Sequence, residues 1–287
     1  MKILNLAVRT PTDVLFYSRW ERIGEVFSSF SNAPLSFISI LVVDHRVLVT
    51  DELLKNLPNL KYIVTANTAH THIVAENSNI KIISLKGEYK FLRSIHSVSE
   101  HVFNLIHRLT RPLRGSGRSL FKKKLLIVGY GRIGKHVAKI AKGYRMTVST
   151  LDLYSSQFDW CDGFKNADFI TIHLPENEST KKIISDELIS IMKHGACLIN
   201  TSRGSILDEE SAFKACASGK ILLGLDTVET DEFLDLDRDL IISNHVGGST
   251  TEDRIKTDEF MVGKTARVLS QAPGNNSLLQ RLIHLKS

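Results

Sequence analysis

The sequence predicts an α/β protein with two domains, each built on a parallel sheet that helices cover. Short runs of apolar and β-branched residues alternate with amphipathic stretches along most of the chain, as expected for strands that alternate with helices. The 287 residues are enough for two domains of ordinary size. A content of 43% hydrophobic and 24% charged residues is typical of a globular protein, and the longest apolar run, 35–43, is too short to span a bilayer.

The first third of the chain contains one such alternation. Strands are expected at 3–8, 37–43, 61–65 and 80–85, where β-branched and apolar residues cluster. Helices are expected at 13–30 and 50–57, with a short one near 70–76. A helical period then runs through 95–109 and ends before Pro112 and the Gly-Ser-Gly at 115–117.

A second alternation starts at Leu125. Strands are expected at 125–129, 147–152, 169–173, 197–201, 222–226 and 240–243, and helices at 132–144, 185–193, 208–218 and 250–270. Asp208 is placed to cap the start of its helix, and Gly219 follows the end of that helix. We expect the chain to cross between domains near residue 95 and to return near residue 250. Residues 1–94 with 250–287 would then form one domain and 95–249 the other.

A glycine motif follows the first strand of the second alternation. Gly129, Gly131 and Gly134 form Gly-x-Gly-x-x-Gly, between an apolar strand and a helical pattern. In such a motif the first glycine permits a tight turn, the second lets a pyrophosphate approach the backbone, and the third packs the helix against the strand. Asp152 ends the next expected strand, where a carboxylate would bind ribose hydroxyls and repel a 2′-phosphate. The pattern favours NAD over NADP; FAD, S-adenosylmethionine or a turn without a ligand are the alternatives.

Three later strand ends carry groups that suit hydride chemistry. Arg203 follows the strand at 197–201, Asp226 ends the strand at 222–226, and His245 follows the strand at 240–243. Hydride transfer to a carbonyl needs a proton donor at the oxygen, and a cation can hold a substrate carboxylate. His245 suits the first task, because an unperturbed histidine has a pKa of about 6.5.

The chain resembles the D-isomer-specific 2-hydroxyacid dehydrogenase family, which includes the phosphoglycerate dehydrogenases. The similarity extends over nearly the whole chain, through the stretches 129–134, 173–180, 195–204, 224–226 and 245–250, and more weakly through 59–63 and 97–101. The resemblance implies two Rossmann/flavodoxin-like domains with parallel sheets and an active site in the cleft between them. It also implies an NAD-dependent oxidoreductase that transfers a hydride between nicotinamide and C2 of a 2-hydroxy or 2-keto acid.

The resemblance also implies roles for individual residues. Arg203 would bind the substrate carboxylate and polarise the keto oxygen, His245 would be the acid–base, and Asp226 would contact the nicotinamide carboxamide. Substrate contacts would come from Ala69, His70 and Arg203. The residues expected to bind the cofactor are Gly129, Gly131, Arg132, Ile133, Gly134, Asp152, His173, Pro175, Thr180, Thr201, Ser202, Asp226 and Gly248.

Two stretches depart from the family. A glutamate that usually supports the histidine has no unambiguous counterpart; we expect Asp231 to serve, with Glu232 second and Glu229 a further alternative. The Gly-x-Gly pair that usually holds the substrate carboxylate is replaced in 67–72, where His70 and His72 appear. The identity of the 2-hydroxy acid therefore does not follow from the resemblance.

Charge and cysteine content limit which binding partners and which cellular compartment are expected. The net charge of +6 comes without interleaved aromatic residues or a nucleic-acid motif, so a small anionic 2-keto or 2-hydroxy acid is expected rather than nucleic acid or a membrane. Three scattered cysteines indicate a reducing compartment, hence the cytoplasm, and no metal site. A homodimer is expected from the family, although its usual contact loop, 112–123, is short. An NAD(H)-responsive regulator, or a relative acting on formate or phosphite, are the competing functions.

Overall fold

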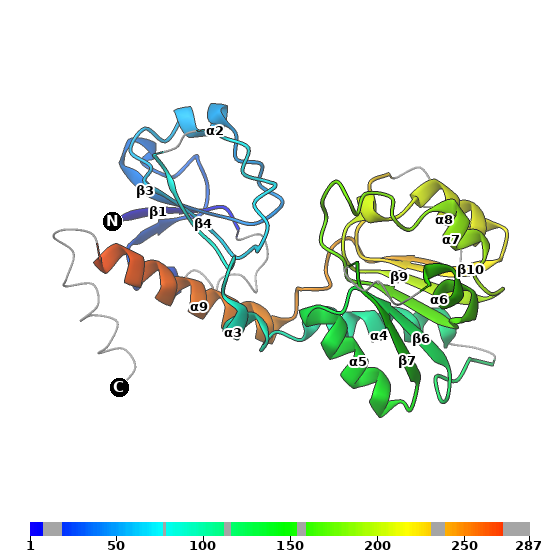
Figure 1. Ribbon diagram of the computed structural model, residues 1–287. Helices are drawn as coiled ribbons and strands as arrows, with labels where there is room; N and C mark the ends of the chain where they lie inside the picture. Colours follow the sequence, from blue (N-terminus) through cyan, green and yellow to red (C-terminus); the bar gives the residue numbers. More distant parts are fainter. Residues whose placement is uncertain (8–18, 77–78, 112–115, 154–158, 231–238, 272–287) are drawn as a thin grey trace. The chain divides into compact units, whose positions relative to one another are not determined.

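A computed structural model of the chain describes residues 1–7, 19–76, 79–111, 116–153, 159–230 and 239–271 (Figure 1). The chain divides into two compact units, one formed by Met1–Leu92 with Thr251–Ser287 and the other by Arg93–Thr250. Each unit contains one parallel sheet with helices packed against it. We call them unit 1 and unit 2.

The sheet of unit 1 has the strand order of flavodoxin-like folds. Its strands, in spatial order, are β2 (Glu25–Phe27), β1 (Lys2–Asn5), β3 (Ile38–Val43), β4 (Tyr62–Thr65) and β5 (Lys81–Ile83). All pair in parallel, and the order along the sheet reverses between β1 and β3.

Alternate residues of these strands bury opposite faces of the sheet. The long helix α9 (Thr251–Ser270) contributes Met261 and Ala266 to the core over one face, which also contains Ile40 and Val64. The other face packs with Leu54 of α2 (Asp51–Lys55), which Thr50 caps through its hydroxyl. Figure 1 shows α9, in orange, running along its face of the sheet. A 3₁₀ turn, η2 (Leu35–Phe37), precedes β3, and a short helix, α3 (Tyr89–Leu92), follows β5.

The sheet of unit 2 is also parallel throughout its described strands. In spatial order these are β11 (Leu240–Ile242), β10 (Ile221–Leu225), β9 (Ala196–Asn200), β8 (Phe169–Ile172), β6 (Lys124–Val128) and β7 (Thr147–Leu151). The first strand in sequence, β6, has β7 on one side and β8 on the other. The point of reversal, where doubly wound folds bind ligands beyond the carboxyl ends of the strands, therefore lies between β6 and β8.

Helices cover both faces of this sheet (Figure 1). Leu125 and Ile127 pack with α4 (Ser97–Thr110) and α5 (Arg132–Gly143), whereas Leu126 and Val128 pack on the other side. That other side is covered by α6 (Trp160–Asn166), α7 (Asp186–Ser190) and α8 (Glu209–Ala217). Strand residues buried on both faces explain the nearly continuous apolar runs that the sequence shows here.

Two helix predictions in unit 1 need correction. The helix predicted at 13–30 extends too far: residues 19 and 20 are helical, residues 25–27 form strand β2, and residues 13–18 lie outside the described part of the chain. No helix forms at 70–76, where Ile73 instead makes an isolated parallel bridge to Val49. Both segments contain apolar residues at helical spacing, but in short segments tertiary pairing overrides this weak signal.

Among the described residues, no helix is long and apolar enough to cross a membrane.

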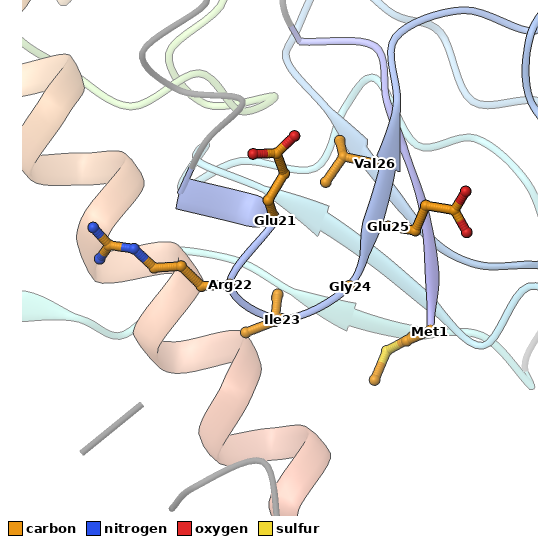
Figure 2. A pocket seen from close by; sticks show the side chains of 7 residues that line it. All are labelled: Met1, Glu21, Arg22, Ile23, Gly24, Glu25 and Val26. Carbon is orange, nitrogen blue, oxygen red and sulfur yellow. The ribbon is translucent and has the colours of Figure 1, made fainter. Parts of the chain in front are cut away.

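A hollow in unit 1 lies at the wrong end of the sheet for catalysis. Met1, Arg22, Gly24 and Glu25 are among the residues that line it, at the amino ends of β1 and β2 (Figure 2). Ligands of parallel α/β sheets bind at the carboxyl ends of the strands. Within each unit, the carboxyl ends of the strands are therefore the better candidates for a site.

Candidate active site

Consecutive carboxyl ends of the unit 2 sheet carry the residues that the sequence singled out. Gly129 follows β6 and His173 follows β8, and then come Arg203 after β9, Asp226 after β10 and His245 after β11. Hydrogen bonds tie the last three strand ends together. The amide of Asp226 donates to Asn200 O on β9, and the amide of His245 donates to Asp226 O.

The glycine loop has the tight geometry that its three glycines permit. Gly129 has φ +95°, and a Cβ there would lie 2.7 Å from the backbone carbonyl carbon and oxygen of His173. A Cβ on Gly134 would overlap the carbonyl oxygen of Gly129. Gly131 caps α5, and a Cβ there would meet nothing within 4 Å, so the start of the helix is open. The first amides of α5 have no partner within the helix, which makes this end suited to an anion such as a pyrophosphate.

Two side chains that follow β8 and β9 have buried polar atoms without a hydrogen-bond partner among the described residues. Burial lowers the pKa of His173 to about 3, so its ring is neutral, yet both enclosed ring nitrogens have no hydrogen-bond partner among the described residues. The buried hydroxyl of Thr201 is likewise unpaired. Asp152 is half-buried directly after β7, whose Leu151 O accepts from the amide of Gly129. The open helix start, the unpaired polar atoms and this carboxylate fit a bound dinucleotide.

The turn that carries Arg203 is held by a buried asparagine. Asn200 is fully buried; its Nδ2 donates to Arg203 O at 2.8 Å and its Oδ1 accepts from the amide of Ser202 at 2.9 Å. The Ser202 hydroxyl donates to Ile172 O on β8 at 2.7 Å. The half-buried guanidinium of Arg203 donates from one nitrogen to Ser202 O, and its Nε lies 4.0 Å from Glu176 Oε2. A guanidinium has five N–H groups, so donors remain for an anionic ligand.

Asp226 holds the loop that carries His245. Its side chain is nearly fully buried, and its carboxylate accepts from the amides of Val246 at 2.9 Å and Gly247 at 3.0 Å. Burial alone would raise the pKa of Asp226. Hydrogen bonds from His101, Ser243 and the Gly247 amide outweigh that effect and lower the pKa to about 2, so the group is ionised at neutral pH.

The backbone at His245 is unusual. Asn244 has φ +53° and His245 has φ +58°, two consecutive non-glycine residues in the left-handed region. Such residues cost of order 1 kcal/mol each or more and persist where the surroundings hold them. Here the Asp226 carbonyl and carboxylate supply that support, and His245 is half-buried.

The acidic residue that we expect to support His245 lies outside the part of the chain that the structure describes. Asp231 and Glu232 lie outside the described residues, and Glu229 is exposed. The backbone amides of Glu229 and Thr230 donate to the carboxylate of buried Glu209, at 3.0 and 3.3 Å. Glu209 also packs against Gly204, the residue after Arg203, because a Cβ on Gly204 would lie 2.5 Å from Oε1 of Glu209. Glu209 therefore contacts both the segment after β10 and the Arg203 turn.

The remaining residues expected to bind the cofactor surround the same strand ends. Arg132 and Ile133 start α5, and the Arg132 guanidinium lies 3.4 Å from Ile95 O. Pro175 and Gly248 are exposed. Thr180 is fully buried, and its hydroxyl donates to Pro175 O at 2.7 Å, so in this structure Thr180 holds the loop after β8.

The expected substrate loop lies at the carboxyl ends of the unit 1 sheet. Ala69, which is exposed, and His70 follow β4, and His70 Nε2 lies 2.7 Å from the hydroxyl of Ser84, which follows β5. Burial and the nearby Lys86 lower the pKa of His70, and burial with the neighbouring His45 and His70 lowers that of His72. Both are therefore neutral hydrogen-bonding groups at neutral pH, not cations.

Three supporting residues were missed in the sequence. Asn200, Glu209 and His101 are all buried or mostly buried polar residues: Asn200 bonds to the Arg203 turn, Glu209 to the segment after β10, and His101 to Ser243 before His245. The signal available was a polar residue inside an otherwise apolar strand, as with Asn200. His101 lies within the 97–101 stretch that carries part of the resemblance, but its partner is distant in sequence.

Comparison with known proteins shows similarity to a family of dehydrogenases. Residues 89–247 match the family model for the D-isomer specific 2-hydroxyacid dehydrogenase NAD binding domain. The hydroxypyruvate reductase of Thermotoga maritima is 32% identical, over 81% of this chain and 85% of that protein. The glyoxylate reductase of Thermococcus litoralis is 29% identical, over 72% and 74%. The fold matches D-lactate dehydrogenases from Aquifex aeolicus (TM-score 0.75, 24% identity, 98% of each chain) and Escherichia coli (TM-score 0.81, 20% identity, 93% and 96%).

The chain therefore belongs to the D-isomer-specific 2-hydroxyacid dehydrogenase family. It is an NAD-dependent oxidoreductase, with NAD as its cofactor, and the expected α/β class with two parallel sheets is confirmed.

Proposed function

We propose that the protein interconverts small 2-keto and 2-hydroxy acids, with His245 as the acid–base and Arg203 as the group that binds the substrate carboxylate. One observation supports this most directly: the hydrogen-bonded ends of β9, β10 and β11 carry Arg203, Asp226 and His245 side by side. An arginine fork suits a carboxylate, and a histidine can carry a proton near neutrality.

The division of tasks follows from these groups. Bound NAD supplies the hydride acceptor or, when reduced, the donor. In the reduction direction His245 gives a proton to the keto oxygen, and in oxidation it takes the proton from the hydroxyl. Arg203 neutralises the substrate carboxylate and polarises the keto oxygen. The backbone near Ala69 and His70 of unit 1 contributes substrate contacts, while the glycine loop, the start of α5, Asp152 and the strand ends at His173 and Thr201 hold the cofactor.

The test is NADH oxidation with a panel of 2-keto acids: glyoxylate, pyruvate, hydroxypyruvate, and larger and phosphorylated members. We expect turnover of at least one, with formate and phosphite inactive in the oxidation direction. NADH binding without turnover of any panel member would contradict the proposal and favour an NAD(H)-responsive regulator.

The expected preference for NADH over NADPH leads to a prediction for a substitution of Asp152. In Asp152→Ala the carboxylate that would repel a 2′-phosphate is removed, so the preference for NADH over NADPH should narrow by about fivefold or more, since one unfavourable charge contact is worth about 1 kcal/mol or more. The measurement is kcat/KM for the two cofactors in parent and variant. A parent enzyme that prefers NADPH, or a variant with an unchanged ratio, would contradict the role of Asp152.

We also infer a cytoplasmic homodimer that acts on a small anionic substrate. The cytoplasmic assignment is supported by three free cysteines, of which Cys197 and Cys216 are buried. The dimer is supported by the resemblance alone, and the mass of the protein in solution tests it.

A further inference from the structure

A histidine from the first helix of unit 2 lies behind the His245 loop. His101, on α4, places Nε2 2.7 Å from the hydroxyl oxygen of Ser243 and 3.4 Å from Oδ1 of Asp226. Ser243 is two residues before His245, and its hydroxyl lies 2.7 Å from the same Oδ1. His101, Ser243 and Asp226 therefore form one chain of contacts that ends at the loop; we call it the support triad.

The direction of the hydrogen bonds in the support triad follows from the ionised state of Asp226. A carboxylate offers no proton, so the Ser243 hydroxyl donates to Oδ1 of Asp226. The hydroxyl oxygen is then free to accept, which requires a proton on Nε2 of His101. The other ring nitrogen, Nδ1, lies 3.4 Å from Nδ2 of Asn104, a donor. A ring that donates from Nε2 and accepts at Nδ1 therefore matches each neighbour of His101.

Close packing indicates that the loop is shaped around the support triad. A Cβ at Gly247 would lie 2.7 Å from Oδ2 of Asp226 and 3.2 Å from Cδ2 of His101, so the residue at 247 has to be glycine for the ring and the carboxylate to stay where they are. The His101 side chain is 11% exposed and that of Asp226 is 3% exposed. These groups are set against the backbone of the loop, whereas the His245 ring is carried on the loop itself.

We infer that His101 and Ser243 are positioning residues for the acid–base: they orient the Asp226 carboxylate, which holds the amides of Val246 and Gly247 and thereby the left-handed turn at His245. This inference rests on the proposed function of His245. His101 and Ser243 contact neither substrate nor cofactor in this assignment, so their effect on turnover passes through the Asp226 carboxylate and the loop that carries His245. A displacement of about 1 Å at a reacting group can reduce a rate about a hundredfold.

The test compares two substitutions of His101. His101→Leu keeps bulk but removes the donor, whereas His101→Gln keeps an N–H at about the reach of Nε2. We expect His101→Leu to lower kcat by between about tenfold and a hundredfold, with little change in the affinity for NADH. His101→Gln should recover most of the loss. His107→Leu is the matched control, because His107 lies further along the same helix and bonds to the Tyr144 hydroxyl, outside the support triad; its kcat should equal that of the parent.

Combining His101→Leu with His245→Ala distinguishes an effect on the position of His245 from a general loss of structure. Adding His101→Leu to the His245→Ala background should not lower kcat further, since residues that act through one group are not additive. A further loss in that background, an unchanged kcat in His101→Leu, or equal impairment in His101→Gln would each overturn the inference. If His245→Ala itself leaves kcat unchanged, the proposed function fails instead, and the two failures are distinguishable.

Discussion

His245→Ala is expected to lower kcat for keto-acid reduction by about two to four orders of magnitude, the usual range for removal of a positioned general acid. NADH binding should persist, because the glycine loop, α5 and Asp152 belong to other strand ends of the sheet. Steady-state kinetics with the best panel substrate and a fluorescence titration of NADH supply the two measurements. A variant that binds NADH and retains more than about a tenth of the parent kcat would remove His245 from the role of acid–base.

The acidic support of His245 is tested by the pH profile of the same reaction. In reduction the histidine must enter protonated. Asp231→Asn would remove a charge that stabilises imidazolium, so the pKa seen in kcat/KM should fall and activity should be lost at a lower pH than in the parent. Glu232→Gln is the internal control. A shift in Glu232→Gln alone would move the assignment by one residue, and no shift in either would exclude a carboxylate at these positions.

Strand positions in unit 2 were predictable because burial on both faces leaves a clear pattern. The strands expected at 125–129 and 222–226 correspond to β6 and β10, with ends that differ by one residue. The glycine loop was equally visible, and at Gly129 and Gly134 a side chain would collide with neighbouring backbone, with φ above zero at Gly129 as well.

Short elements without such a pattern were missed. Strand β2 has three residues, too few for an alternation to be recognised. Helix α6 contains Gly163, a poor helix former, but a Cβ there would lie 3.3 Å from the Leu126 side chain, so close packing on the sheet compensates for low propensity. In both elements pairing or packing, not local sequence, decides the structure.

The candidate site shows a similar division. The residues that would touch substrate follow strands and could be named from the sequence, as Arg203 and His245 were. The groups that hold them come from distant segments: His101 and Ser243 are 142 positions apart. Periodicity carries no information about contacts of that kind, so they required the structure.

Replacing Arg203 tests the other half of the proposed site. The backbone of this arginine is fixed independently of its side chain, because Asn200 bonds to Ser202 N and Arg203 O. Arg203→Gln should therefore keep the turn while removing the charge and the fork. Loss of one preorganised donor to a developing oxyanion costs about two to three orders of magnitude in kcat, and the lost carboxylate contact should raise KM for the keto acid as well.

Arg203→Lys distinguishes charge from geometry. A lysine restores the positive charge but not the planar pair of donors, so kcat/KM should lie between those of Arg203→Gln and the parent. Arg108→Gln, at an exposed arginine on α4, is the control for general charge effects and should match the parent. NADH affinity should be the same in all four proteins, because neither the Arg203 nor the Arg108 side chain is among the groups assigned to the cofactor, and the Asn200 hydrogen bonds keep the Thr201 and Ser202 backbone in place. If Arg203→Gln retained the parent kcat/KM while NADH still bound, the substrate carboxylate would have to be held by another group, and the backbone near Ala69 and His70 would be the first place to test.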